Sequence, residues 1–291
     1  MPHSSLDNCT QGVKNALDSA GIEYDVQVGS SGSADSDCQS YAEQMASSGN
    51  YSAIIAVATP AAVSAYSAVR NASSNIPVIF CAVSDPVSAG LVNSVDEPGN
   101  NCTGTSDAID IAGQVKLIKT LQPNIKNLGV IYTTTEANSI SQLATLKAEC
   151  DANGINLVQK GINEASELQA VSVSLVSEVD AVTNLTDNNV VDNMSVVLEQ
   201  ANQKGIPIYG SEIEQVKKGC IASASIDYVA LGEKTGNIAV DVLGGKSAAT
   251  YPVVTVSDSF LVVNPDVASS LGITIPAELN DAQKVSTSAA Q

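Results

Sequence analysis

The chain has 291 residues, a length typical of two domains rather than one. Hydrophobic residues make up 44%, enough for buried cores, whereas 31 acidic residues against 13 basic ones give a formal net charge of −18. This balance excludes binding to nucleic acid or to anionic lipid through the overall field of the protein, because the required excess of lysine and arginine is absent.

Strand and helix patterns alternate along almost the whole chain. Short apolar runs predict buried strands at Ala53–Val57, Val78–Val83, Leu128–Tyr132, Ala181–Leu185 and Ile206–Tyr209. A 3.6-residue apolar repeat predicts helices at Leu6–Ala20, Ala61–Ala72, Ile140–Asn153, Val190–Lys204, Leu231–Leu243 and Pro265–Leu271. The alternation predicts an α/β protein of two similar halves, with parallel sheets covered by helices on both faces.

The composition also limits the chemistry. The only histidine is His3, which disfavours a Ser-His-Asp hydrolase and a zinc site built from several histidines. Neither a Gly-x-Gly-x-x-Gly loop nor a Walker lysine motif occurs. We therefore expect no enzyme activity, no catalytic residues, no metal and no cofactor. A hydrolase with paired carboxylates stays open on Asp85, Asp187 and Asp227, although no pattern singles out an acid and a base.

The cysteines give no redox or zinc motif. They are too widely spaced for Cys-x-x-Cys, and six cysteines allow 15 pairings, among which the sequence does not choose. Buried small hydrophobic residues are the simpler interpretation. The positions are Cys9, Cys38, Cys81, Cys102, Cys150 and Cys220.

Polar residues follow the predicted strands, at the edge where open α/β sheets bind ligands. Thr59 and Pro60 predict an N-cap and a first helical residue, and the free N–H groups there suit a carboxylate. An ordinary cap without a ligand is the alternative. Asp85 either caps the next segment or faces a cationic ligand group. Further polar residues follow later strands, at 133–139, 186–188, 210–212 and 225–228.

Several motifs follow one another at the spacing of a known family. They include Thr59-Pro60-Ala61-Ala62, Val83-Ser84-Asp85-Pro86-Val87, Gly90-Leu91-Val92, Pro98-Gly99-Asn100-Asn101, Thr186-Asp187-Asn188, Asp227-Tyr228 and Val263-Asn264-Pro265. Over nearly its whole length the chain resembles the ABC-transporter substrate-binding proteins of the tryptophan/tyrosine-type lipoprotein family.

This resemblance implies a type I periplasmic-binding-protein fold, with two Rossmann-like lobes, a hinge of several crossovers and a small molecule, here an amino acid, bound in the cleft by closure. Residues 1–106 with 227–250 are assigned to lobe 1, residues 107–226 with 251–279 to lobe 2, and residues 280–291 to a frayed tail. The implied partner is a transporter permease, and the implied location is outside the cytoplasm.

The resemblance also implies site residues. Thr59 and Ala61 suit the ligand carboxylate, and Asp187 suits its ammonium group, since a buried charge needs a partner. Four further candidates are Ser84, Asp85, Asn138 and Asp227, and Tyr228 is a candidate pocket wall. For Asp227 and Tyr228 a helix cap with core packing is the alternative interpretation.

Two departures from the family pattern qualify these expectations. The chain starts directly on the motif Pro2-His3-Ser4-Ser5-Leu6, so we expect that a first strand of lobe 1, a signal peptide and a lipid-carrying cysteine are missing from this sequence. Aromatic residues make up only 3%, which favours an aliphatic amino acid or another small polar ligand over an aromatic one. A binder of nucleosides or sugars, a sensory module and an α/β enzyme remain as alternatives.

Overall fold

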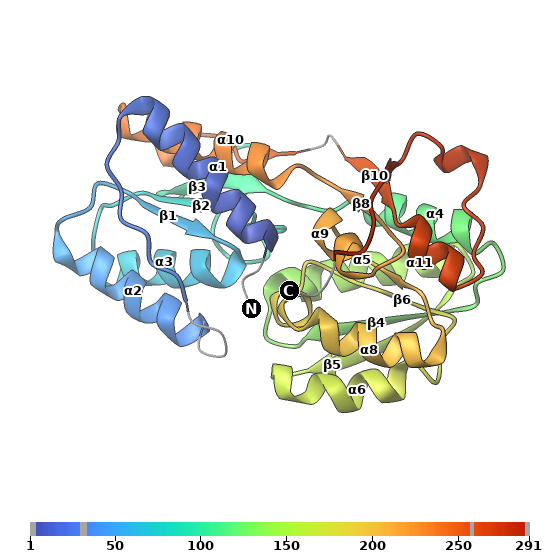
Figure 1. Ribbon diagram of the computed structural model, residues 1–291. Helices are drawn as coiled ribbons and strands as arrows, with labels where there is room; N and C mark the ends of the chain where they lie inside the picture. Colours follow the sequence, from blue (N-terminus) through green and yellow to red (C-terminus); the bar gives the residue numbers. More distant parts are fainter. Residues whose placement is uncertain (1–3, 30–33, 257–258, 289–291) are drawn as a thin grey trace. The chain divides into compact units, whose positions relative to one another are not determined.

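The computed structural model describes residues 4–29, 34–256 and 259–288 (Figure 1). The chain divides into two compact units, which are described separately. Unit 1 comprises Met1–Ala108 and Asp227–Ser257, and unit 2 comprises Ile109–Ile226 and Asp258–Gln291. Within the described residues, no helix has the length and apolar character needed to cross a membrane.

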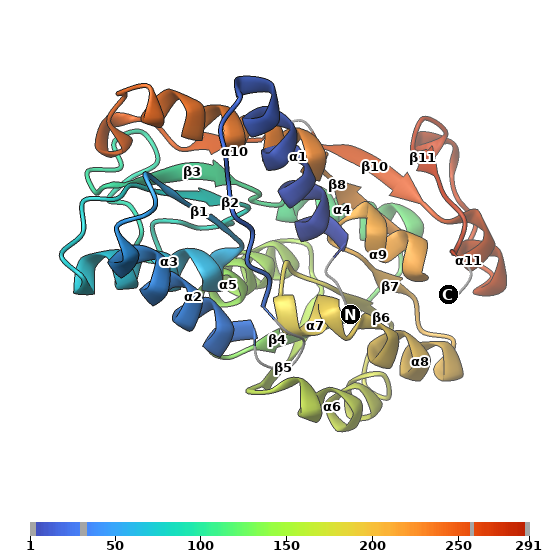
Figure 2. The same cartoon turned by 60° about the vertical axis from the view of Figure 1, so that its left-hand side comes forward.

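Unit 1 is built on a parallel sheet in the order β1-β2-β3-β9. Helices α1 and α10 cover one face of this sheet, and α2 and α3 cover the other (Figures 1 and 2). Phe80 and Ile79 of β2 are fully buried between these layers. The strands are β1 (Ile54–Val57), β2 (Val78–Cys81), β3 (Cys102–Ser106) and β9 (Val254–Thr255), and the helices are α1 (Ser4–Ala20), α2 (Ala34–Ser48), α3 (Thr59–Asn71) and α10 (Tyr228–Leu243).

Helices α1 and α10 touch backbone to backbone because glycines line their contact. A Cβ atom on Gly12 would lie 2.1 Å from the carbonyl oxygen of Val229, and one on Gly232 would lie 2.1 Å from that of Cys9. Gly236 is equally constrained, with 2.6 Å to the Cβ of Ala16. Any larger side chain would force the two helices apart.

The segment after α1 runs extended without joining the sheet. Residues 22–29 form no strand, and three apolar side chains that alternate along the segment are exposed, namely Tyr24, Val26 and Val28. Among the described residues, β1 is an edge strand of the sheet of unit 1.

Unit 2 is built on a sheet in the order β11-β10-β8-β7-β6-β4-β5, in which only the β8–β10 pair is antiparallel. Its strands are β4 (Asn127–Thr133), β5 (Asn156–Ile162), β6 (Ala181–Thr183), β7 (Ile208–Tyr209), β8 (Ala222–Ser225), β10 (Phe260–Val263) and β11 (Gln283–Lys284). Its helices are α4 (Ile111–Leu121), α5 (Ala137–Ala152), α6 (Leu168–Leu175), α7 (Asn188–Asp192), α8 (Met194–Lys204), α9 (Ile213–Lys218) and α11 (Pro265–Ser270). Short 3₁₀ turns of this unit lie at Ala165–Glu167 and Ala277–Leu279, and a third, Ala248–Thr250, belongs to unit 1.

Strand β4 shows why this sheet is covered on both faces. Leu128 and Val130 belong to the core formed with α4, α5 and α11, whereas Ile131 belongs to the core formed with α6 and α8. Alternate side chains of a strand point to opposite faces, so a continuous apolar run serves two cores. Gly129 faces Leu175 of α6 at a distance that leaves no room for a Cβ atom.

Several predicted elements differ in detail from the structure. The predicted helix at 190–204 is two helices, α7 and α8, that meet at Asn193. Residues 254–255, which were assigned to lobe 2, pair with β3 of unit 1 because Thr105 and Ser106 offer them a free strand edge. The prediction of a frayed tail is wrong for residues 283–288, since β11 pairs with β10 and Ser288 N–H donates to the carbonyl of Lys217.

The glycine contact between α1 and α10 predicts a large local effect of one methyl group. We expect Gly232→Ala to destabilise the protein by about 2 kcal/mol or more, because the new methyl would overlap the backbone of α1. Thermal unfolding measures the loss. Gly244→Ala at the end of the same helix is the matched control. The backbone of Gly244 is right-handed, and the atom nearest to a Cβ placed there would be 3.3 Å away. Equal melting temperatures for the two variants would contradict the contact.

Candidate functional site

The carboxyl ends of the strands carry the polar residues in both units, as the sequence predicts. In unit 1 the backbone is also strained there. Ala58, directly after β1, has φ 79°, and Ala82, directly after β2, has φ 55°. Non-glycine residues rarely adopt positive φ, and such strain gathers at sites where the backbone has a functional position.

Helix α3 begins one residue earlier than the sequence indicates. Ala58 is the N-cap, so Thr59 is the first helical residue and Pro60 the second. No side chain caps the helix. The amino end of α3 therefore keeps backbone donors and the positive end of the helix dipole directed away from the helix, an arrangement that suits an anion. Thr59 is 5% exposed and Ala61 is half-buried.

Ser84 and Tyr228 meet on Asp107, a residue that the sequence analysis did not select. The Ser84 hydroxyl donates to Oδ1 of Asp107 at 2.8 Å, and the Tyr228 hydroxyl donates to Oδ2 at 3.2 Å. Burial raises the pKa of Asp107, and the two hydroxyl donors counteract part of that rise. This cluster ties the end of β2 to the start of α10, next to positions where the chain passes between units.

Asp85 and Asp227 each form a local cap. The carboxylate of Asp85 accepts from the backbone N–H and the hydroxyl of Ser88, at 2.9 and 2.6 Å. Asp227 is exposed and accepts from the backbone N–H of Ala230 at 3.0 Å as the N-cap of α10. Together with the 5% exposure of Tyr228, this is the cap and packing arrangement that the sequence offered as the alternative. Ligand contacts of these residues stay a prediction.

Asp187 of unit 2 is a buried carboxyl whose hydrogen bonds all come from the protein itself. Its side chain is fully buried and accepts four hydrogen bonds, from Thr133 N at 2.5 Å, Thr133 Oγ1 at 2.8 Å, Ser139 Oγ at 2.7 Å and Val190 N at 3.0 Å. These bonds use the capacity of a carboxylate. Asp187 thereby caps α7 and fixes the end of β4 against α5, and an ammonium group would have to displace one of these donors to reach it.

Glu136 is the second buried carboxyl of this edge, and it also accepts four hydrogen bonds. It is 8% exposed and accepts from Asn188 Nδ2 at 2.7 Å, Asn188 N at 3.1 Å, Asn138 Nδ2 at 3.2 Å and Asn189 N at 3.3 Å. All of these donors are neutral. Burial, and then the charge of Asp187, raise the pKa of Glu136 to about 7.

Asn138 lies beside Glu136, and only the nitrogen of its side-chain amide is hydrogen-bonded. Its Nδ2 donates to Thr186 O at 2.7 Å and to Glu136, which fixes the orientation of the amide, because a flipped oxygen would face two acceptors. Its Oδ1 is buried and has no hydrogen-bond partner. A buried acceptor without a donor is rare in folded proteins.

The structure thus groups the predicted residues within each unit. Ser84 and Tyr228 meet in unit 1 through Asp107, and in unit 2 Asn138 donates to the carbonyl of Thr186, the residue before Asp187. Sequence reasoning missed Asp107 and Glu136. Both follow a strand by only a few residues, and that position was the available signal.

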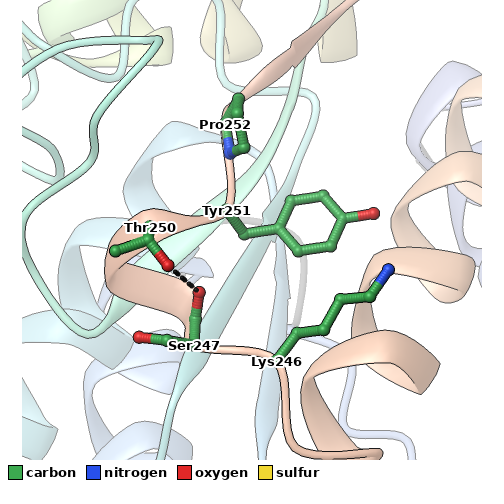
Figure 3. A pocket seen from close by; sticks show the side chains of 5 residues that line it. All are labelled: Lys246, Ser247, Thr250, Tyr251 and Pro252. Atoms are coloured by element: carbon green, nitrogen blue, oxygen red, sulfur yellow. Dashed lines mark hydrogen bonds between the residues drawn. The ribbon is translucent and has the colours of Figure 1, made fainter.

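Other features are less suited to a ligand. Among the described residues no group of His, Cys, Asp and Glu is arranged to hold a metal ion. Five of the cysteines, Cys9, Cys81, Cys102, Cys150 and Cys220, are buried free thiols, and Cys38 is partly exposed. Unit 1 has a pocket of about 560 Å³. Figure 3 shows the residues that line it, Lys246, Ser247, Thr250, Tyr251 and Pro252. Its lysine is already paired with Asp241 at 2.9 Å.

The environment of Glu136 predicts a pH-dependent stability. Because the folded-state pKa is above the unfolded value, this carboxyl favours folding at low pH and loses that contribution as pH rises from about 4.5 through 7. We expect Glu136→Gln to stabilise the ligand-free protein at pH 8 by about 1–2 kcal/mol, less than full linkage because the amide loses one acceptor. Urea unfolding at pH 5 and pH 8 measures the difference, with the exposed Glu199→Gln as control. A less stable Glu136→Gln at pH 8 would contradict the burial argument.

Comparison with known proteins places this geometry in a family. The family model for ABC transporter substrate binding proteins matches residues 1–286. A tyrosine-binding protein of Clostridioides difficile is 39% identical over 280 residues, covering 93% of this chain and 78% of the relative. An ABC domain from Streptococcus pneumoniae in complex with L-Trp is 32% identical, with a TM-score of 0.92 and coverage of 98% of each chain.

Two further solved structures are similar. The ligand-free, open structure of a substrate binding protein with adhesive properties from Clostridium difficile is 35% identical, with a TM-score of 0.72 over 99% of this chain and 97% of that one. A solute binding protein from Bacillus halodurans with bound myo-inositol, 17% identical with a TM-score of 0.65 over 92% of this chain and 93% of that one, shares the fold alone. The predicted type I periplasmic-binding-protein fold is confirmed, and the chain belongs to the family of ABC transporter substrate-binding proteins.

Proposed function

We propose that this protein binds a free aromatic amino acid outside the cytoplasm and delivers it to the permease of an ABC transporter. The observation that carries the proposal is the pair of relatives with known ligands. One is the tyrosine-binding protein at 39% identity, and the other is the structure in complex with L-Trp at 32% identity, which matches over 98% of this chain. Both ligands are aromatic α-amino acids.

This proposal changes the ligand that the composition favours. The low aromatic content argued for an aliphatic amino acid, because stacking on tryptophan or tyrosine is one way to bind a ring. Aliphatic side chains also pack against rings, so a low aromatic content does not by itself exclude an aromatic ligand. The relatives therefore outweigh the composition.

The residues of unit 1 support binding of the α-carboxylate. The amino end of α3 has no side-chain cap, and Thr59 and Ala61 lie in its first turn. The N–H groups of a helix start favour a carboxylate both by hydrogen bonding and through the helix dipole. We assign the carboxylate contacts to these two residues, with Ser84, which follows β2, as a further candidate.

Binding without catalysis is the form of action we propose. An enzyme using a thiol nucleophile would need Cys81 or Cys102 in contact with its substrate, and both side chains are fully buried. Likewise, the sugar-type binder has no observation in its favour beyond a shared fold, because the relative with bound myo-inositol is only 17% identical.

A thermal-shift screen tests the ligand class. We expect L-tyrosine and L-tryptophan to raise the melting temperature in a concentration-dependent manner that follows mass action, by about 2.7 kcal/mol of stabilisation at a hundred times Kd. The other amino acids, purines, pyrimidines and simple sugars complete the panel. A shift with a sugar or a nucleoside and none with any amino acid would overturn the proposed ligand.

A charge placed at the start of α3 tests the carboxylate site. We expect Ala61→Asp to weaken binding of the amino acid at least about tenfold, because two negative charges would meet. The same substitution leaves the ligand-free protein as stable as before or stabilises it, since an acidic side chain favours a helix N-terminus. Isothermal titration measures the affinity, with the neutral Ala61→Asn as matched control. Equal affinities for the two variants would place the carboxylate elsewhere.

A further inference from the structure

We propose that Asp107 is a positioning residue of the hinge, which holds two of the chain connections of unit 1 together and attaches both to Ser84, a candidate ligand residue. Its effect on binding rests on the proposed function, that is, on a ligand bound by closure. The hydrogen bonds that carry the proposal all lie within unit 1, so they are also open to a test without a ligand.

The position of Asp107 in the chain is the first step. The chain passes between the two units after Ala108, after Ile226 and after residue 257. Asp107 directly precedes the first of these points, and Tyr228 follows the second by two residues. Movement of one domain against another is absorbed by a few connecting residues. The contacts that hold these residues in unit 1 therefore decide where the backbone is free to bend.

A single side chain joins the first connection to the second. Oδ2 of Asp107 accepts from the hydroxyl of Tyr228, the first residue of α10, at 3.2 Å. The two residues are 121 positions apart in the sequence, and both are buried. A hydrogen bond shielded from water is stronger than an exposed one, so this contact fixes the two connections to each other.

Ser84, which follows β2, is attached to the first connection twice. Its hydroxyl donates to Oδ1 of Asp107 at 2.8 Å, and its carbonyl accepts from the hydroxyl of Ser106 at 3.0 Å. The same Ser106 hydroxyl accepts from the backbone N–H of Ala108 at 3.2 Å. A displacement of Ser84 is therefore passed to Asp107, and through it to Tyr228.

The third connection is held in another way. Thr255 pairs with Ser106 in the parallel pair of β3 and β9, and the N–H of Val256 donates to the carbonyl of Ser106 at 3.4 Å. These are backbone contacts, and the side chain of Asp107 takes no part in them. Loss of the Asp107 hydrogen bonds should therefore loosen the first two connections and leave the third unchanged.

A purely structural role is the alternative to a positioning role. In that case Asp107 stabilises unit 1 as any buried hydrogen-bonded group does, and its loss changes only global unfolding. A positioning role instead changes the local opening of the connections in the folded protein. It also changes ligand affinity, because loosened connections must be ordered again when the ligand binds.

Hydrogen exchange of the ligand-free protein, followed by NMR, tests the hinge contact. Tyr228→Phe removes the hydroxyl that donates to Asp107 and keeps the ring. We expect the amides of Ala108, Ala230 and Leu231 to exchange about fivefold faster than in wild type, the effect of losing one hydrogen bond. The amide of Val256 should exchange as before. Unchanged exchange at Ala108, Ala230 and Leu231 would overturn the proposal.

Two other tyrosines supply matched controls. Tyr209→Phe removes a hydroxyl that donates to Gln122 at 2.9 Å in the core of unit 2, and Tyr51→Phe removes one that donates to Asp25 at 3.1 Å in unit 1. Neither should alter exchange at the connections or the affinity for L-tyrosine. If Tyr209→Phe accelerates the same amides as Tyr228→Phe does, the effect is one of global stability and the positioning role is wrong.

Calorimetry with L-tyrosine tests the effect on binding. We expect Tyr228→Phe to bind about threefold to tenfold more weakly than wild type. Since Tyr228 is also a candidate pocket wall, a double-mutant cycle separates the two roles. In the Asp107→Ala background, Tyr228→Phe should change the affinity by less than about twofold. The full loss in that background would show a direct ligand contact and overturn the positioning role.

Melting of each variant shows that it is folded, and the exchange test needs no variant of Asp107. An unchanged affinity of Tyr228→Phe would overturn the link from the hinge to binding. If wild type binds no amino acid, the proposed function fails, and the exchange rates of the ligand-free protein still decide whether Asp107 holds the connections.

Discussion

A buried negative charge must be fully hydrogen-bonded, and this constraint organises the carboxyl edge of unit 2. Asp187 meets it with donors from the end of β4, from α5 and from its own helix α7. Three separate elements are thereby fixed around one carboxylate, and removing any of the donors would leave an uncompensated charge. The positions of Glu136 and Asn138 follow, because both lie between these anchored segments.

The two buried carboxyls of this edge, Asp187 and Glu136, have similar hydrogen bonds but different neighbours. Each accepts four hydrogen bonds from neutral donors, and Glu136 in addition has a raised pKa and a neighbouring acceptor, Asn138 Oδ1, without a partner. A buried acceptor without a donor, such as Asn138 Oδ1, costs stability, and natural proteins break such local rules mainly at functional sites. In unit 1 the strained backbone at Ala58 and the uncapped start of α3 are the corresponding features.

Individual residues show how far the site could be predicted. The motif Thr-Asp-Asn correctly identified a buried acid at Asp187, but motif matching does not reveal that Thr133 and Ser139, about fifty positions earlier, saturate it. Glu136 stands in a polar run after a strand, where nothing distinguishes it from Thr134 or Thr135. Its burial and its partner Asn188 come from the packing of α7 against β4, which is a long-range contact. Asp107 was missed because β3, with the sequence CTGTS, has no apolar run and was not among the predicted strands.

The sequence by itself determined the alternation of strands and helices, the α/β class and the family, because apolar periodicity and motif spacing are local properties that survive without coordinates. It also indicated which edge of each sheet carries the polar residues. Only the tertiary structure decided that residues 254–255 join unit 1, that residues 283–284 extend the second sheet, and that Glu136 and Asp187 are both buried and hydrogen-bonded at the same edge. The reason is physical: strand pairing, desolvation and hydrogen-bond saturation depend on groups that are distant in the chain and meet only when it folds.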